Sequence, residues 1–159
     1  MSVDIKQKSA TSKIIEYKDK GFLFHGSQTP NLTEIKPKES GHGNNYVYAV
    51  SDPAFAAMFS VNNRGNTLVA MWKRNQQGVP CLCERKEGIF NTLYKGQKSS
   101  IYILNRENFS QKKGMWSSEF VSDKREPVVD ELHIKDVREF LLELEKQKEF
   151  QLIEYKDRK

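Results

Sequence analysis

The chain has 159 residues, 37% of them hydrophobic and 30% charged, with a formal net charge of +5. This length is typical of one domain with its own core, so we expect a single domain over 1–159, with its core at about 12–150 and a loose start at 1–11. The polar start lacks the apolar segment of a secretory signal, and no run approaches the roughly 18 apolar residues of a membrane-spanning helix. We therefore expect a cytoplasmic protein that does not bind membranes.

The charge permits an acidic partner without requiring one. The basic residues are spread along the chain and form no block of like charge, so we interpret most of them as solvated surface. The two cysteines, Cys81 and Cys83, have neither a second pair nor a nearby histidine, which is a weak pattern for a zinc site. We expect them to be structural, with side chains on opposite faces of a strand, and we expect no metal.

The first part of the chain predicts a helix, a strand and a long loop. Residues 12–20 fit a short helix that Gly21 ends. Residues 22–24 form an apolar, aromatic run that fits a buried strand. This strand stops at the His-Gly-Ser sequence at 25–27, which presents an imidazole, a bare backbone and a hydroxyl together. Turn-forming residues dominate 28–45, a loop long enough to form a binding rim.

A second strand leads directly into a helix. The strand is expected at 46–50. Asp52 can cap the helix, and Pro53 suits its first position, because the N–H that proline lacks has no partner there. Phe55 and Phe59 then fall on one helical face.

The remainder of the chain predicts mainly strands and one final helix. Strands are expected at 67–72, near 79–84, at 101–104, at 116–121 and at 128–134, the last strand of the chain. Asp136 and Glu139 form a capping box before a helix whose apolar stripe belongs to the core. Strands outnumber helices and do not alternate regularly with them, which predicts the α+β fold class. Part of the first helix, 12–20, is echoed at 152–159, but two copies this short do not make a repeat.

Several candidates for chemistry lie on the predicted strands. Glu119 is a carboxylate in the middle of a mostly apolar strand, which places it either at a water-exposed edge or inside a site. Glu131 has the same two interpretations, with Asp130 and His133 beside it. There is no Gly-x-Gly-x-x-Gly, no Gly-Lys-Ser/Thr and no catalytic-triad spacing, so the ordinary dinucleotide, nucleoside-triphosphate and triad sites are excluded.

Taken together, three motifs in this order resemble the ADP-ribosyltransferase family, in its His-Tyr-Glu branch of diphtheria-type toxins and poly(ADP-ribose) polymerases. The first motif is the strand that ends in His-Gly-Ser at 25–27. The second, at 48–60, is a strand carrying Tyr48 that leads into a helix with Ala-Ala and another aromatic residue. The third is Glu119 followed by an aromatic residue, a turn and a further strand. The resemblance covers about 21–135.

The resemblance implies a split β-sandwich of two small, mostly antiparallel sheets with flanking helices, and a groove for NAD between the sheets. It implies that NAD is a substrate, and that His25, Tyr48 and Glu119 form the catalytic set. The resemblance also implies a role for each residue that matches the family's NAD site. His25 binds the ribose on the adenosine side, and the Gly26 backbone holds the nicotinamide amide, with Ser27 in the same turn. Tyr48 and Phe59 sandwich the nicotinamide ring, Ser51 offers a nearby hydroxyl, and Glu119 binds the ribose at the scissile bond.

The implied activity is transfer of ADP-ribose from NAD to an acceptor, with release of nicotinamide. The acceptor could be a protein, a nucleic acid or a small molecule. Ser117 stands where arginine-modifying members carry a second glutamate, so arginine modification is not expected. The chain shows no long regulatory region, which favours a single transfer over polymer synthesis. Phe59 stands where the family usually has tyrosine, which keeps the stacking face and loses a hydroxyl.

Three alternatives stay open at this point. A relative that acts on the 2′-phosphate of RNA would use further basic residues, for which His42 and Arg64 are the candidates. A non-catalytic module would bind NAD or ADP-ribose and would not need Glu119. A small basic domain without a nucleotide site would leave His25, Tyr48 and Glu119 far apart.

Overall fold

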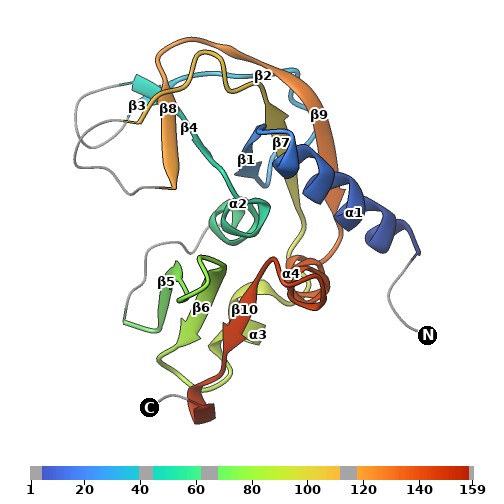
Figure 1. Ribbon diagram of the computed structural model, residues 1–159, viewed down its shortest axis with the longest axis vertical. Helices are drawn as coiled ribbons and strands as arrows, with labels where there is room; N and C mark the ends of the chain where they lie inside the picture. Colours follow the sequence, from blue (N-terminus) through green and yellow to red (C-terminus); the bar gives the residue numbers. More distant parts are fainter. Residues whose placement is uncertain (1–4, 40–44, 62–67, 112–117, 158–159) are drawn as a thin grey trace.

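The computed structural model describes residues 5–39, 45–61, 68–111 and 118–157 (Figure 1). None of the helices in these ranges is long and apolar enough to cross a membrane. The helices are α1 (Ile5–Asp19), α2 (Pro53–Ser60), α3 (Ile89–Tyr94) and α4 (Val137–Lys146), with a final 3₁₀-helix, η1 (Tyr155–Asp157). The strands are β1 (Leu23–Ser27), β2 (Glu34–Ile35), β3 (Lys38–Glu39), β4 (Asn45–Val50), β5 (Ala70–Arg74), β6 (Pro80–Glu84), β7 (Ser99–Leu104), β8 (Glu119–Ser122), β9 (Glu126–Ile134) and β10 (Gln151–Ile153).

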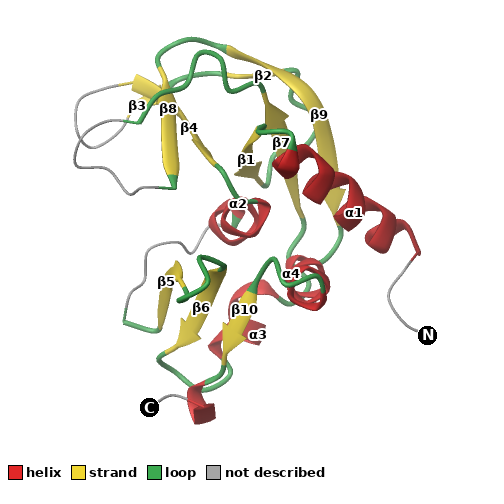
Figure 2. Ribbon diagram, in the orientation of Figure 1, coloured by secondary structure: helices red, strands yellow, loops and turns green. Residues whose placement is uncertain are grey.

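The strands form two sheets (Figure 2). The larger sheet is antiparallel and has the order β2-β9-β7-β1-β4-β3, with β8 also paired to β4. The smaller sheet has the order β10-β6-β5, in which β10 runs parallel to β6 and β5 antiparallel to it. The chain is therefore an α+β protein with two mostly antiparallel sheets, as its sequence predicts.

The main core lies between the two sheets, around α2 and α4 (Figure 1). It joins Phe24 of the larger sheet, Phe55 of α2, Phe140 of α4 and Leu82 of the smaller sheet. A second apolar cluster lies on the other face of the larger sheet and includes Leu23. Neighbouring residues of β1 thus point into different clusters, as the alternation of a strand requires.

Several local predictions are confirmed. Gly21 ends α1 with a φ of 89°, a backbone conformation that glycine adopts without strain. Pro53 is the first residue of α2. The Asp136 side chain caps α4 by accepting the backbone N–H of Glu139 at 3.3 Å.

Other predictions differ from the structure. The first helix begins at Ile5 and includes most of the 1–11 start that we expected to be loose, which its good helix formers allow. Helix α3 was not predicted, and β10 follows β9, so the strand at 128–134 is not the last one. The predictions for 116–117, His42 and Arg64 fall outside the described residues.

The expectation that the two cysteines point to opposite faces of a strand is wrong. Cys81 and Cys83 are two residues apart on β6, and residues two apart in a strand share a face. Their Sγ atoms lie 3.7 Å apart. Burial raises the pKa of the Cys81 thiol to about 12, which keeps this thiol protonated and unreactive.

Candidate active site

Three neighbouring strands carry the predicted catalytic residues. His25 lies on β1, Tyr48 on β4 and Glu119 on β8, and β4 lies between the other two strands. Val50 of β4 pairs with Phe24 on one side and with Glu119 on the other, so these residues form one cross-strand row. At the usual spacing of strands, the ends of this row lie about 10 Å apart. The sheet therefore places three residues that are distant in the sequence on adjacent strands.

Strands β1 and β4 separate immediately beyond this row. Phe24 and Val50 are their one register pair, whereas β1 stays paired with β7 as far as Ser27. Within the described ranges, the edge of β1 at Gly26 and Ser27 therefore has no strand partner on the β4 side. An unpaired strand edge presents N–H and C=O groups to which a ligand can bind.

The imidazole of His25 bonds across the separation. Its Nδ1 lies 2.7 Å from the Tyr48 carbonyl oxygen. Because a carbonyl only accepts hydrogen bonds, Nδ1 carries the proton and Nε2 is the acceptor nitrogen of the neutral ring. Burial lowers the pKa of His25 and the charge of Lys38 lowers it further, against the opposing effect of the bond to Tyr48. At pH 7 the ring is therefore neutral, with its orientation fixed by the β4 backbone.

This environment predicts a pH dependence of stability. The pKa of His25 is lowered in the folded protein from the ordinary value of 6.5, so between these two values the unfolded chain binds more protons. The contribution of His25 to stability is thus complete above the ordinary pKa and falls as the pH falls through this window. We expect the melting temperature to drop more for the wild type than for His25→Asn between about pH 7.5 and about pH 5.5, because asparagine does not titrate. Equal drops would contradict a neutral imidazole that the fold shields from water.

Glu119 is the first residue of β8 and is half-buried. Burial raises the pKa of its carboxyl. Among the described residues, no hydrogen-bond donor or cation contacts this carboxylate. A desolvated carboxylate without a partner costs folding free energy, and such groups cluster at functional sites.

Each of the two predicted stacking rings is held by another aromatic ring. Tyr48 meets Tyr46 edge-on, with ring centroids 6.0 Å apart. Phe59 of α2 stacks on Phe55, with centroids 5.8 Å apart and planes at 12°. Tyr48 and Phe59 are both half-buried. Each therefore has a supported orientation and some accessible surface, which suits stacking on a ligand.

Gly26 allows α2 to lie directly on β1. A Cβ atom at this position would lie 2.0 Å from the Ala56 carbonyl oxygen and 2.8 Å from the Ser60 Cβ. The helix covers the face of the strand, whereas the N–H and C=O of Gly26 lie in the plane of the sheet. Packing and ligand binding can therefore use different sides of this residue. In the adjoining turn, the Ser27 hydroxyl accepts the Thr29 backbone N–H at 3.1 Å.

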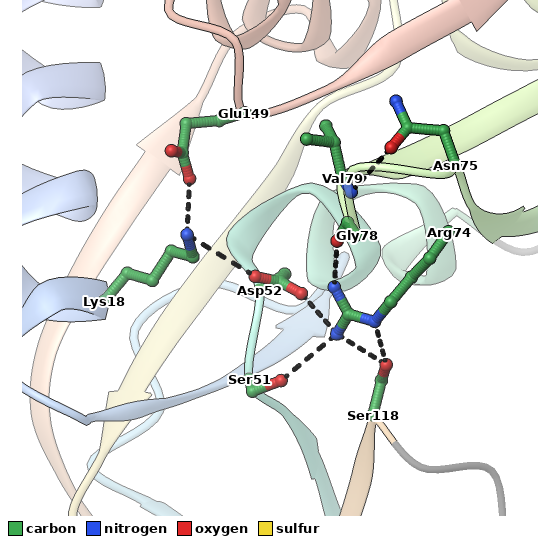
Figure 3. Close-up of polar contacts among 9 residues, drawn as sticks. All are labelled: Lys18, Ser51, Asp52, Arg74, Asn75, Gly78, Val79, Ser118 and Glu149. Atoms are coloured by element: carbon green, nitrogen blue, oxygen red, sulfur yellow. Dashed lines mark hydrogen bonds and ion pairs between the residues drawn. The ribbon is translucent and has the colours of Figure 1, made fainter.

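A polar network that the sequence analysis missed includes Ser118, the residue before Glu119 in the chain (Figure 3). Arg74 of β5 donates to the Ser118 hydroxyl from Nε at 2.9 Å and from Nη2 at 2.6 Å. Its Nη2 also lies 2.5 Å from the Asp52 carboxylate and 3.5 Å from the Ser51 hydroxyl. Ser51, predicted to contact the cofactor, thus belongs to this network.

Asp52 stands at the N-cap of α2, but its side chain makes no capping hydrogen bond. Its carboxylate contacts Arg74 through one oxygen, and the other oxygen lies 3.8 Å from Nζ of Lys18. Lys18 in turn pairs with Glu149 at 2.8 Å (Figure 3). The expected cap is therefore wrong in its side-chain role, because two cations hold the buried carboxylate.

Glu131 binds the loop that follows β1. It accepts the Ser100 hydroxyl at 2.6 Å and the Asn31 backbone N–H at 3.1 Å. His133 lies 3.4 Å from the same oxygen. These contacts fix the loop over the sheet, so Glu131 has a structural explanation that Glu119 lacks.

A cavity of about 460 Å³ lies elsewhere, between α3, α4 and the C-terminal end of the chain. Glu84, the buried acid in its wall, accepts the backbone N–H groups of Phe90 and Tyr155, one with each carboxylate oxygen. The Glu84 carboxylate therefore links β6 to α3 and to the final 3₁₀-helix. In the part of the chain that the structure describes, no group of three or more His, Cys, Asp or Glu side chains could hold a metal ion.

Comparison of the chain with protein-family models, with curated proteins and with solved structures finds no match.

Proposed function

We propose that this protein is an NAD-dependent mono-ADP-ribosyltransferase, which transfers ADP-ribose from NAD to an acceptor and releases nicotinamide. The observation that carries this proposal is the strand order β1-β4-β8, which places His25, Tyr48 and Glu119 on adjacent strands of one sheet. The family resemblance requires these three residues to share one site. A chance match of three short motifs would not supply their adjacency in a sheet.

The finer fold that we propose is the split β-sandwich of this family. In Figure 1 the two sheets lie on either side of α2 and α4. The strand with His25 and the strand with Tyr48 separate after one register pair. Such a separation gives an extended dinucleotide access to both strand edges.

The chemistry fits the environment of Glu119. When the bond between the nicotinamide nitrogen and ribose C1′ breaks, the electron pair leaves with nicotinamide and positive charge develops on the ribose, as in glycoside hydrolysis. A half-buried carboxylate on a paired strand would stabilise this charge, because its backbone is already in place before the reaction. The nucleophilic atom of the acceptor then bonds to C1′ and loses its proton.

The other residues of the site would bind and orient NAD. The Nε2 acceptor of neutral His25 suits a ribose hydroxyl, which donates a hydrogen bond. The edge of β1 at Gly26 suits the carboxamide of nicotinamide, which both donates and accepts. Tyr48 and Phe59 offer faces on which the nicotinamide ring can stack.

The proposal is tested by incubating the purified protein with NAD. We expect nicotinamide release above the protein-free rate, with water as the default acceptor. We also expect NAD to raise the melting temperature, because a ligand that binds the native state stabilises it. His25→Ala should lose most of this thermal shift. A shift without release would replace the transferase with a binding module, and the absence of both would overturn the proposal.

A further inference from the structure

Arg74 lies where the two sheets meet. It is the last residue of β5 in the smaller sheet, whereas Ser118 directly precedes β8 in the larger one. Besides its two bonds to the Ser118 hydroxyl, Arg74 donates from Nη1 to the Gly78 carbonyl at 2.8 Å. The guanidinium also lies over the Phe55 ring, 5.2 Å from its centroid. All three guanidinium nitrogens and one face of the group are thus held.

Two partners of Arg74, Ser118 and Asp52, are buried, and the charges of the network are balanced. Ser118 is 1% exposed, and the side chain of Asp52 is 8% exposed. Asp52 neutralises Arg74, and Lys18 connects Asp52 to Glu149. A buried ion pair adds little net stability because desolvation offsets the attraction, so this network contributes mainly by fixing a geometry.

The geometry that the network fixes is the start of β8. Ser118 is held through its hydroxyl by Arg74 and through its carbonyl, which accepts the Ser51 backbone N–H at 3.3 Å. The next residue is Glu119. We propose that Arg74 is a positioning residue for Glu119 and acts through Ser118. This inference rests on the proposed function, because it takes Glu119 as the catalytic carboxylate.

Arg74 acts on Glu119 through geometry and not through charge. A guanidinium close to a carboxylate would lower its pKa. Burial instead raises the pKa of Glu119, and no charged neighbour contributes to the shift. The charge of Arg74 is already matched by Asp52. A substitution that keeps the charge but removes the forked geometry should therefore disturb Glu119.

Two substitutions and a matched control test this role. Arg74→Lys keeps the charge beside Asp52 but has no planar fork to grip Ser118. Ser118→Ala removes the accepting hydroxyl and leaves the ion pair intact. The control is Arg138→Lys, because the side chain of Arg138 is 28% exposed, close to the 30% of Arg74, and ion-pairs with Glu139 on α4.

For nicotinamide release from NAD, we expect kcat to fall about tenfold to a hundredfold in Arg74→Lys and Ser118→Ala, because small misplacements of a catalytic group have effects of this size. KM for NAD should stay within about twofold of the wild type, because loss of a contact made only in the transition state lowers kcat alone. Arg138→Lys should match the wild type in both constants. A normal kcat in both test variants, or a raised KM with a normal kcat, would overturn the positioning role.

A second readout separates this inference from the proposed function. Titration of the Glu119 carboxyl by ¹³C NMR, assigned by comparison with Glu119→Gln, reports its environment without any turnover. We expect a midpoint above the ordinary glutamate range in the wild type and in Arg138→Lys, and a lower midpoint in Arg74→Lys and Ser118→Ala, where water reaches the carboxylate. If the wild type does not turn over NAD, the proposed function is rejected, and the titration alone then tests the positioning role of Arg74. An equal midpoint in all four proteins would overturn that role.

Discussion

Glu119→Gln is expected to reduce nicotinamide release at least about a hundredfold while the protein stays folded. Glutamine keeps the shape of Glu119 but lacks the negative charge that would stabilise the ribose cation. Removal of one preorganised electrostatic group of this kind typically lowers kcat by about 10² to 10³. KM for NAD should change little, because the lost interaction develops only as the bond breaks. Nicotinamide release by the two proteins at saturating NAD measures the difference.

The same variant should be no less stable than the wild type at pH 7. Burial raises the pKa of the Glu119 carboxyl above its ordinary value of 4.5, so the folded protein binds more protons than the unfolded chain between these values. Stability contributed by Glu119 is therefore present below the ordinary pKa and lost as the pH rises through the raised one. Glutamine does not titrate, so the melting temperature of Glu119→Gln should equal or exceed that of the wild type at pH 7.

Glu131→Gln is the matched control, because Glu131 is also a half-buried carboxylate on a strand of the larger sheet. Its contacts with Ser100 and Asn31 explain it structurally, so nicotinamide release should persist in this variant. Turnover at the wild-type rate in Glu119→Gln would show that Glu119 is not the catalytic carboxylate. Loss of turnover in Glu131→Gln alone would show the same.

The strands of the site could be predicted because their signals are local. Aromatic and branched residues mark β1 and β4, and the Asp-Pro step marks the start of α2. The adjacency of these strands depends on pairing between distant segments, which no local signal specifies. We expected His25, Tyr48 and Glu119 to lie close together because their motifs occur in the order of the family that the sequence resembles.

The network around Arg74 could not be predicted in this way. Its members come from α1, the start of α2, the end of β5, the residue before β8 and the residue at 149. Taken singly, its charged members fit a solvated surface, and Asp52 fits a helix cap. At Asp52 the local sequence and the folded structure disagree. The residue preference of helix N-caps predicts a capping side chain, whereas the folded chain places two cations beside the carboxylate.

One short sequence adopts different structures at its two occurrences. Ile-Glu-Tyr-Lys-Asp occurs at 15–19 and again at 153–157. The first copy ends α1, whereas the second begins in β10 and continues through the final 3₁₀-helix. Strand β10 forms by parallel pairing with β6, where Leu152 lies opposite Leu82. The partner strand therefore decides the conformation, which is why β10 was missed from the sequence.

Gly26→Ala is expected to destabilise the fold by about 3 kcal/mol, the upper part of the usual range for overpacking a core. The added methyl group would lie 2.0 Å from the Ala56 carbonyl oxygen. A backbone atom cannot rotate aside, so α2 must move away from β1 and open the core between the sheets. For a chain of this size the melting temperature should fall by about 10 °C, measured by thermal unfolding.

Gly88→Ala separates this steric effect from the general cost of replacing a glycine. Gly88 has a φ of 76°, and among the described residues no atom beyond its own local backbone and chain neighbours lies within 4 Å of the Cβ that alanine would add. Its substitution should cost only the strain of the left-handed backbone, about 1 kcal/mol. A fall for Gly26→Ala no larger than that for Gly88→Ala would contradict the close contact of α2 with β1. A larger fall would mean that packing alone requires the glycine of the His-Gly-Ser motif. In that case the proposed NAD binding rests on His25 and the open strand edge, because packing already explains why residue 26 is a glycine.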